Sequence, residues 1–512
     1  MGGKMSRRKI ISFLLLIIAT SFAFTVPSGA KPSMRLLPGT EENPVFEYSG
    51  TSFDAEILET ADGEFVRLDF EEAYPGGEIG HPQLPIIRKL IQIPFGASPR
   101  ISIEQIETET FGLEDLGIFF PVFPRQAPVP KIKDFRPDFE YRKDVYERNA
   151  LVFERSVEII DVQTARNYRL ALIEIRPVNY NPAAREIEVI QNLRFSVQFP
   201  GADFVETRRI KERYSSQAYD SAIRPLIQNP RAWETRWLPD VNSLGFLIIT
   251  GGSYGSSIGD LVHWKTRKGY TVKTRTAASL GGTTAGIRNW ILAEYDTAAI
   301  APTFVLLVGD VGDVPRYTGS GSSSATDTPY GNMDATGYIP ELFVGRISPA
   351  STPQLEHFLD RIIDYEHFNI LPGHDDFPDK ACFLASNDGS FWHVAEATHR
   401  YAVQTHFGPA GFACDTIKAR SNPNHHIATI NAINDGRMIV NYSGHGGYYS
   451  WEAPEMDASD VEDLTNIGEY PFVISNACIT GTYNLAECFG ETWIRQFDKG
   501  AIAFVGASNN SY

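Results

Sequence analysis

The spacing of apolar positions changes near residue 244 and divides the chain into two regions. Over residues 42–200, apolar and polar side chains mostly alternate, as they do along 193–200. Turn-forming residues at 179–182 separate two of these alternating runs. Alternation that is bounded by Asn/Pro turns is typical of antiparallel hairpins. The sequence therefore predicts a β-rich domain over residues 31–204, and nothing in that domain indicates catalysis.

After residue 244 the pattern becomes a repetition of strand, turn and helix. Residues 246–249 form a continuous apolar run, and apolar positions from Ile258 onward keep helical spacing until Gly269. Further apolar runs lie at 304–308, 380–385, 413–417, 437–442, 472–476 and 501–505. Continuous apolar strands that alternate with amphipathic helices indicate a mostly parallel sheet with helices on both faces. We therefore predict an α/β domain over residues 241–512.

Residues 205–240 lie between these two regions and differ from both in composition. They are rich in aromatic and basic side chains, the basic ones being Arg208, Arg209, Lys211, Arg213, Arg224, Arg231 and Arg236. Exposed connectors of this kind are preferred sites of proteolytic cleavage. We predict a connector and candidate processing region here, and a surface helix with basic residues is an equally good interpretation.

The first thirty residues have the layout of a secretory signal peptide. Basic residues precede a mostly apolar run at 10–23, and the small residues Ser28 and Ala30 follow it. The apolar run is short for a membrane span, although an uncleaved anchor is the alternative interpretation. No later segment has enough consecutive apolar residues to cross a bilayer. We expect a signal peptide over residues 1–30, a secreted or cell-surface protein, and no stable membrane span after signal cleavage.

Charge and cysteine content narrow the classes of function. The 512 residues include 46 Lys+Arg and 63 Asp+Glu, which gives a formal net charge of −17 and argues against a nucleic-acid partner. Four cysteines are too few for a disulfide scaffold, although they leave room for one or two bridges, and we expect Cys382 and Cys414 to be buried. The glycine-containing loop at 251–256 lacks the spacing of a dinucleotide site, so nucleotide binding is not expected.

A histidine and a cysteine each follow the end of a predicted apolar strand. His445 lies in 441–447, which reads Asn-Tyr-Ser-Gly-His-Gly-Gly, and Cys478 follows the strand at 472–476. Chemistry in open α/β sheets collects at the ends of strands, where side chains are held rigidly beside a crevice. A cysteine becomes nucleophilic when a neighbouring base removes its proton, and histidine is the usual base. The pair predicts a catalytic dyad, provided that adjacent parallel strands carry the two residues.

Acyl transfer also needs hydrogen-bond donors for the oxyanion and a group that orients the imidazole. The main-chain amides of Gly446 and Cys478 are the natural donors, because a glycine and the nucleophile's own amide leave room for the carbonyl oxygen. Asp388 lies just past the strand at 380–385 and is the best-placed acid to orient His445. An aspartate that caps a loop or a helix is the alternative interpretation of Asp388.

These motifs resemble the gingipain family of caspase-like cysteine peptidases. The resemblance is carried by 441–447 with Trp451 shortly after, by 476–481, and by the runs at 305–310, 343–346 and 503–508. It covers residues 244 to the end of the sequence, and the β-rich region resembles the pro-domain of that family. The resemblance implies a caspase-like fold, with Cys478 and His445 as the catalytic pair. It also implies Asp388 at the acidic position and Trp451 in substrate binding.

The resemblance has further implications and two departures. It implies a structural calcium ion, for which oxygen ligands are available at Asp327, Asn332, Asp334 and Glu341, while a polar turn is the alternative interpretation. Arginine-specific members carry an aspartate near the start of the helix that follows the Asp388 loop. Residues 390–393 read Ser-Phe-Trp-His and lack such an acid, so cleavage after arginine is not implied. Family members also continue beyond residue 512, so we expect a fragment or an altered substrate pocket.

The sequence thus predicts a secreted cysteine endopeptidase made as a zymogen. Its partners would be protein or peptide substrates and its own pro-domain, which would act as an inhibitor, and catalysis would require no cofactor. Two other interpretations remain. One is a secretion-linked processing peptidase or transpeptidase that shares the dyad. The other is a non-catalytic surface protein built on a peptidase scaffold.

Overall fold

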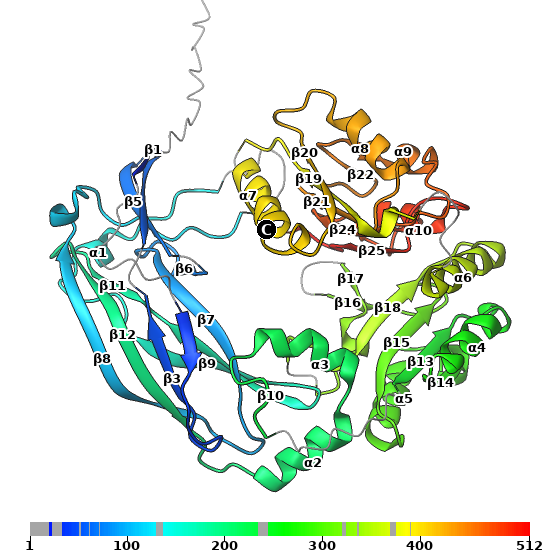
Figure 1. Cartoon of the computed structure of the whole chain (residues 1–512), viewed down its shortest axis with the longest axis horizontal. Helices are drawn as coiled ribbons and strands as arrows, with labels where there is room; N and C mark the ends of the chain where they lie inside the picture. Colours follow the sequence, from blue (N-terminus) through cyan, green and yellow to red (C-terminus); the bar gives the residue numbers. More distant parts are fainter. Residues whose placement is uncertain are drawn as a thin grey trace, which may run out of the picture.

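The computed structural model combines an antiparallel β-rich part with two parallel α/β sheets (Figure 1). The structure describes residues 20–22, 33–50, 53–60, 62–70, 72–129, 137–233, 244–319, 324–334, 337–368, 375–389 and 391–511. Most of the predicted signal peptide, residues 1–30, therefore lies outside the described residues. Within the described residues, no helix is both long enough and apolar enough to span a membrane.

The β-rich part, residues 20–198, contains three antiparallel sheets, in the orders β1-β4-β5, β6-β7-β10-β9 and β11-β12-β3-β2, with β8 paired to β12. Its strands are β1 (Thr20–Phe22), β2 (Ser33–Leu36), β3 (Val45–Ser49), β4 (Asp54–Thr60), β5 (Gly63–Asp69), β6 (Tyr74–Gly76), β7 (Leu84–Gln92), β8 (Arg100–Gly112), β9 (Val157–Ala165), β10 (Tyr168–Ile175), β11 (Val178–Asn181) and β12 (Glu186–Gln198). Two short helical turns, η1 (Glu114–Leu116) and α1 (Lys143–Tyr146), interrupt the strands. The predicted β-rich character is confirmed.

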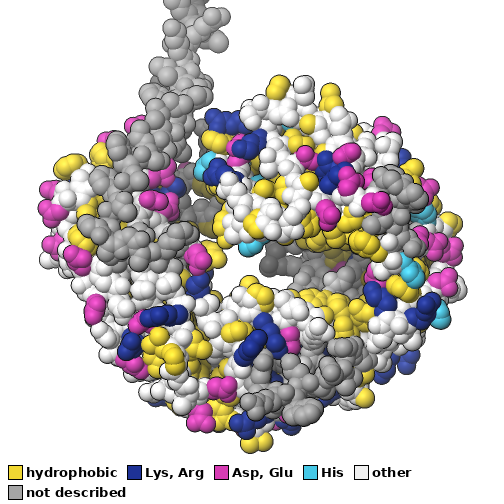
Figure 2. All heavy atoms as spheres, in the orientation of Figure 1, with side chains coloured by type: hydrophobic (Ala, Val, Ile, Leu, Met, Phe, Trp, Pro, Cys, Tyr) yellow, Lys and Arg dark blue, Asp and Glu magenta, His cyan; other side chains and the backbone are white. Residues whose placement is uncertain are grey.

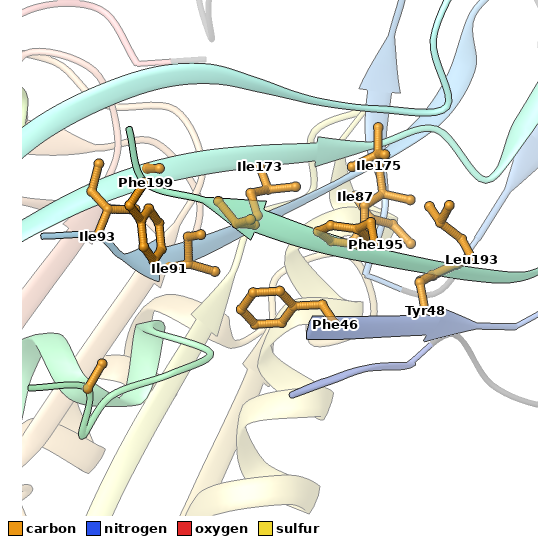
Figure 3. Packing of buried hydrophobic residues seen from close by; sticks show 14 of the residues in the cluster. Phe46, Tyr48, Ile87, Ile91, Ile93, Ile173, Ile175, Leu193, Phe195 and Phe199 are labelled. Atoms are coloured by element: carbon orange, nitrogen blue, oxygen red, sulfur yellow. The ribbon is translucent and has the colours of Figure 1, made fainter. Parts of the chain in front are cut away.

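Two of these sheets share one apolar core (Figure 3). Alternate residues of β7 and β10, such as Ile87 and Ile173, face alternate residues of β3 and β12. Phe46 on β3 stacks on Phe195 on β12, with ring centroids 5.6 Å apart. The alternation in the sequence therefore reflects strands that turn every second side chain into this core.

The connector region forms helices over its first part. Asp203 caps α2 (Phe204–Tyr214) and Ser216 caps α3 (Gln217–Ile223), each by accepting a hydrogen bond from a backbone amide in the first turn. A short turn, η2 (Arg224–Leu226), follows. The structure thus favours the helical interpretation as far as residue 226, while residues 234–243 lie outside the described part of the chain.

The first α/β sheet has the order β14-β13-β15-β18, and all its pairings are parallel. Its strands are β13 (Gly245–Thr250), β14 (Thr271–Thr276), β15 (Pro302–Val308) and β18 (Phe343–Ile347). Its helices and small elements are η3 (Tyr254–Ser256), α4 (Gly259–Arg267), η4 (Ala278–Leu280), α5 (Thr284–Thr297), β16 (Tyr317–Thr318), β17 (Ala325–Thr326), η5 (Thr328–Tyr330) and α6 (Thr352–His367). Leu247 packs with Ile287 of α5 on one face, and Ile248 packs with Leu261 of α4 on the other.

The second α/β sheet has the order β20-β19-β21-β24-β25 and is also entirely parallel. Its strands are β19 (Lys380–Ala385), β20 (Ala413–Lys418), β21 (Ile439–Ser443), β24 (Phe472–Asn476) and β25 (Ala503–Gly506). Its other elements are η6 (Phe377–Asp379), α7 (Trp392–Ala402), η7 (Val403–Phe407), α8 (His425–Asn434), β22 (Ser450–Trp451), β23 (Met456–Asp457), α9 (Ala458–Glu462) and α10 (Phe489–Arg495). The predicted class is confirmed: mostly parallel sheets with helices on both faces, preceded by a β-rich part.

Buried arginines join the two α/β sheets. Arg361 of α6 donates to the carbonyl oxygen of Ala501 at 2.8 Å, and Arg495 of α10 donates to that of Ser348 at 2.7 Å. The sheets and the β-rich part surround a central hollow on the face drawn in Figure 2. No disulfide joins any of the four cysteines, all of which lie in the described residues, and Cys382 is buried as predicted while Cys414 is only partly buried.

Candidate active site

The carboxyl ends of three neighbouring strands bring the predicted catalytic residues together. Ala385 of β19 pairs with Ser443 of β21, and Ser443 pairs with Asn476 of β24. Asp388, His445 and Cys478 each follow one of these paired residues by two or three positions. Neighbouring strands lie about 4.8 Å apart, so the three side chains start from adjacent positions on one edge. The adjacency of strands on which the predicted dyad depends is present.

Asp388 contacts both the imidazole and the helix that follows it. Its Oδ2 is hydrogen-bonded to Nε2 of His445, and its Oδ1 accepts the backbone N–H of Phe391 at 2.7 Å, just before α7. Both side chains are largely buried. Asp388 therefore fits both interpretations, because one carboxylate oxygen contacts the imidazole and the other accepts a backbone amide at the start of α7.

Cys478 lies under the segment that follows β25. Its side chain is 2% exposed, and its Sγ accepts the backbone N–H of Ser511 at 3.2 Å. The next residue, Ile479, has a φ of 52°, a left-handed conformation that is unusual for a β-branched side chain. Such strained residues persist where the surrounding structure over-determines them, and they cluster at functional sites. The backbone conformation after Cys478 therefore marks this turn as a site under structural constraint.

Gly446 packs directly against the turn that carries Cys478. A Cβ atom at Gly446 would lie 2.8 Å from the Cβ of Ala477, 2.8 Å from Cγ2 of Thr480 and 2.9 Å from the carbonyl oxygen of Cys478. Contacts this short are forbidden for real side chains, so only glycine allows the histidine loop and the cysteine turn to approach so closely. The roles of the Gly446 and Cys478 amides as oxyanion donors remain predictions.

The structure corrects the prediction for Trp451. Its side chain is 1% exposed, its ring stacks on Tyr442 at 4.5 Å, and its indole N–H donates to Oγ of Ser475 at 2.9 Å. An indole enclosed in this way has no free face for a substrate. The physical role of Trp451 is to tie β21 to β24 beneath the site, which the proximity of Trp451 to the histidine motif did not reveal.

Two residues that the sequence reasoning missed support the same edge. The hydroxyl of Tyr442 donates to the carbonyl oxygen of His445 at 2.6 Å. His399 of α7 is buried beside β21, and its Nε2 lies 3.0 Å from Oγ of Ser443. Burial lowers the pKa of His399 to about 4, so its imidazole is neutral at neutral pH. Tyr442 lies within the histidine motif at 441–447, so its position in the sequence could have indicated its role. The role of His399 could be found only from the fold.

The calcium ligands predicted from the sequence do not act as one set. Asp327 forms a two-pronged ion pair with Arg346, at 2.7 and 2.8 Å, and this pairing removes Asp327 from the predicted ligands. Among the described residues, no three His, Cys, Asp or Glu side chains form a group suited to a metal ion. However, Oδ1 of Asn332 and Oε1 of Glu341 are buried and have no hydrogen-bond partner in the described structure. Burial raises the pKa of Glu341 to about 7, and nearby Asp334 adds to this effect.

Comparison with known families agrees with this geometry. Residues 240–512 match the model of peptidase family C25, and residues 26–212 match the model of the C25 propeptide. The chain belongs to peptidase family C25. The family match begins close to β13 and covers both parallel sheets, and the propeptide match covers the β-rich part from β2 onward and most of α2.

Individual relatives of this C25 family member come from Porphyromonas gingivalis. Lys-gingipain HG66 is 29% identical over an alignment of 517 positions, which covers 98% of this chain and 30% of the relative. Gingipain R2 is 23% identical over 98% of this chain and 68% of its own length. The solved structure of the Arg-specific cysteine proteinase gingipain R is 27% identical, with a TM-score of 0.47, over 54% of this chain and 66% of that one. The chain thus spans less than a third of the Lys-gingipains that it matches.

Proposed function

We propose that this C25 family member is a cysteine endopeptidase that is made as a zymogen. The observation that carries the proposal is the Asp388–His445 pair at the same sheet edge as the Cys478 thiol. An acid that orients an imidazole beside a thiol is the arrangement that activates a cysteine nucleophile. The strained turn after Cys478 and the close packing of Gly446 add support, because both fix the geometry of the pair before substrate arrives.

In the proposed mechanism, His445 removes the proton of Cys478, and Sγ forms a bond to the scissile carbonyl carbon. The amides of Gly446 and Cys478 stabilise the resulting oxyanion. The imidazolium then gives its proton to the leaving amine, the C–N bond breaks, and an acyl-enzyme remains. Water, deprotonated by His445, attacks this thioester, which releases the carboxylic acid and restores the thiol.

The same proposal assigns the β-rich part as the inhibitor that keeps the zymogen inactive. The match to the C25 propeptide supports this assignment. The expected processing site lies between residues 205 and 240, of which the structure describes the part up to 233. Cleavage there should raise peptidase activity, and the rise is measurable as the increase in peptide hydrolysis before and after controlled cutting.

A substitution pair tests the nucleophile. Cys478→Ala should abolish hydrolysis of a peptide library and should remove, at position 478, the label that a thiol alkylator leaves when it inactivates the wild type. Cys414→Ala is the matched control, because Cys414 is a partly exposed thiol, whereas the other three are buried, and it lies outside the site. If Cys478→Ala protein still cleaves peptides at the wild-type rate, the proposed mechanism fails.

Export through residues 1–30 belongs to the same proposal. Its support is the arrangement of basic, apolar and small residues in the sequence. N-terminal sequencing of the protein recovered outside expressing cells should find a chain that begins at Lys31. A chain that stays in the membrane fraction with Met1 intact would contradict it.

We also propose that Asn332, Asp334 and Glu341 hold a structural calcium ion. Its support is the pair of buried, unpartnered oxygen acceptors on Asn332 and Glu341, because hard cations prefer oxygen ligands. When bound, the ion would neutralise the buried carboxylate of Glu341 and stabilise the loop before β18. Calcium should raise the thermal unfolding temperature of the wild type but not of Glu341→Gln, and an equal shift in both would overturn the assignment.

A further inference from the structure

The side chain of Arg166 extends from the β-rich part to the first α/β sheet. The residue stands at the tip of the β9–β10 hairpin with a φ of 58°, and its side chain is 2% exposed. Its Nη1 donates to the carbonyl oxygens of Pro302 at 2.6 Å and Glu341 at 3.3 Å, and its Nη2 donates to that of Ala301 at 3.4 Å. Its Nε donates to the carbonyl oxygen of Tyr214 at 2.7 Å. One side chain thus joins the hairpin, the end of α2 and two loops of the sheet.

The charge of Arg166 is held by backbone dipoles and aromatic rings. Within the described residues it has no ion-pair partner, while the rings of Tyr219 and Tyr295 lie 5.8 and 5.7 Å from its guanidinium carbon. A buried charge is costly unless hydrogen bonds replace its water shell, and guanidinium offers five donors in a rigid fork. Here four carbonyl oxygens from three segments supply that replacement. The burial of Arg166 is therefore favourable only when hairpin, helix and sheet are together.

Other contacts near Arg166 join the same two parts of the molecule, the β-rich part with its helices and the first α/β sheet. The hydroxyl of Tyr219 on α3 donates to the carbonyl oxygen of Pro340 at 2.7 Å, and Tyr214 stacks on Tyr295 of α5 at 4.6 Å. Arg213 donates to the carbonyl oxygen of Ala298 at 2.7 Å. Figure 1 shows α3 between β10 and the first sheet. The β-rich part and its two helices therefore form one continuous contact surface with the sheet.

This surface lies away from the candidate active site. Pro302 is the first residue of β15, and Glu341 precedes β18, so Arg166 meets the amino edge of the first sheet. The catalytic residues stand at the carboxyl edge of the second sheet. Attachment through Arg166 therefore does not involve the candidate catalytic residues.

We propose that Arg166 anchors the β-rich part to the first sheet after the chain is cut within residues 234–240. The partner is the chain's own β-rich part, together with α2 and α3, acting as a separate subunit. The inference rests on the proposed zymogen function, since it requires a cut in the connector. It adds the side chain that holds the two fragments together after the cut, because the contacts of Arg166 do not depend on the peptide link.

The test uses the full chain with Cys478→Ala, so that it cannot process itself, and with a recognition site for an unrelated protease inserted within 234–240. After cutting, the two fragments should co-elute in gel filtration when Arg166 is intact. Arg166→Met should raise the dissociation constant at least about 30-fold, because it leaves several buried carbonyl oxygens unpaired. Arg166→Lys should give an intermediate value, since it keeps the charge but lacks the fork.

Arg169→Met is the matched control. Arg169 stands on the same hairpin and also donates to backbone carbonyls, those of Pro94 at 3.0 Å and Ala97 at 2.7 Å, but both lie within the β-rich part. It should lower the stability of that part without changing the dissociation constant. Unchanged binding by both Arg166 variants, or equal weakening by Arg169→Met, would overturn the anchor. If Arg166→Met fails to fold, Arg166→Lys alone decides. Failure of the peptidase proposal would appear separately, as absent hydrolysis by the protein with Cys478 intact.

Discussion

The hydroxyl of Tyr442 donates a hydrogen bond to the carbonyl oxygen of His445, at 2.6 Å, from inside the second sheet. Tyr442 is fully buried, and its ring stacks on that of Trp451. The aromatic core that joins β21 to β24 thus also holds the loop that carries the candidate catalytic histidine. The stability of the core and the geometry of the site are coupled through this one hydroxyl.

Removal of that hydroxyl should reduce both stability and activity. Tyr442→Phe keeps the ring and its stacking but leaves the His445 carbonyl without this donor, at a cost of about 1–3 kcal/mol. We expect kcat to fall by about tenfold or more while KM changes little, because imidazole placement matters for the transition state rather than for binding. Steady-state kinetics on a peptide substrate would measure both constants. Tyr448→Phe is the control, since Tyr448 lies in the same loop but is 45% exposed; an equal loss in both variants would contradict the argument.

Trp451→Phe should act on stability and not on substrate affinity. The substitution removes buried volume and the hydrogen bond to Ser475, which together should cost about 2–4 kcal/mol of unfolding free energy. Chemical unfolding monitored by circular dichroism would measure the loss. A rise in KM with unchanged unfolding free energy would instead restore the substrate-binding role that the sequence suggested.

The architecture of the α/β part could be predicted because its strands are fully buried. A continuous apolar run such as 472–476 leaves few alternatives once helical segments surround it, and the observed β24 has those bounds. Asp388, His445 and Cys478 could be chosen for a related reason: a polar residue just past a buried strand must lie at a sheet edge. To predict their chemistry, it was enough to know the residue types and where the strands end.

Features that depend on contacts between distant segments could not be predicted. In the sequence, Trp451 has the position of an exposed aromatic residue near the site. In the fold, it lies in the hairpin β22–β23 and packs against β21. Asp327 looked like a metal ligand because its partner, Arg346, is nineteen residues away on β18. Nothing in the sequence distinguishes Arg166 from the other basic residues of the β-rich region. In each case the deciding partner is remote in sequence, and periodicity carries no information about it.

Asp388→Asn should separate the two tasks of Asp388. An asparagine oxygen can still accept the Phe391 amide, so the start of α7 and the unfolding free energy should be largely preserved. The orientation and the favoured tautomer of His445 should be lost, and kcat should fall by about 10²–10⁴-fold. Asp388→Ala removes both interactions and should lower stability as well. A variant Asp388→Asn with wild-type kcat would show that the imidazole needs no acid.

Glu341 should make the protein less stable as the pH rises in calcium-free buffer. Its pKa is raised from 4.5 to about 7 by burial, so the folded state holds this proton after the unfolded chain has lost it. A raised pKa contributes stability that is complete below pH 4.5 and is lost as the pH rises through about 7. The loss is on the order of 3 kcal/mol. Urea unfolding at pH 4.5, 6 and 8 with a chelator present would measure it.

Glu341→Gln provides the comparison for that pH series. The neutral amide keeps the size of the side chain, so the variant should lack this part of the pH dependence and should be more stable than the wild type at pH 8. Added calcium should reverse the order at pH 8, because only the wild-type carboxylate gains a cation that compensates its charge. Parallel pH curves for the two proteins would show that Glu341 is ionised at neutral pH in the fold without penalty, and would remove the physical basis for a cation at this site.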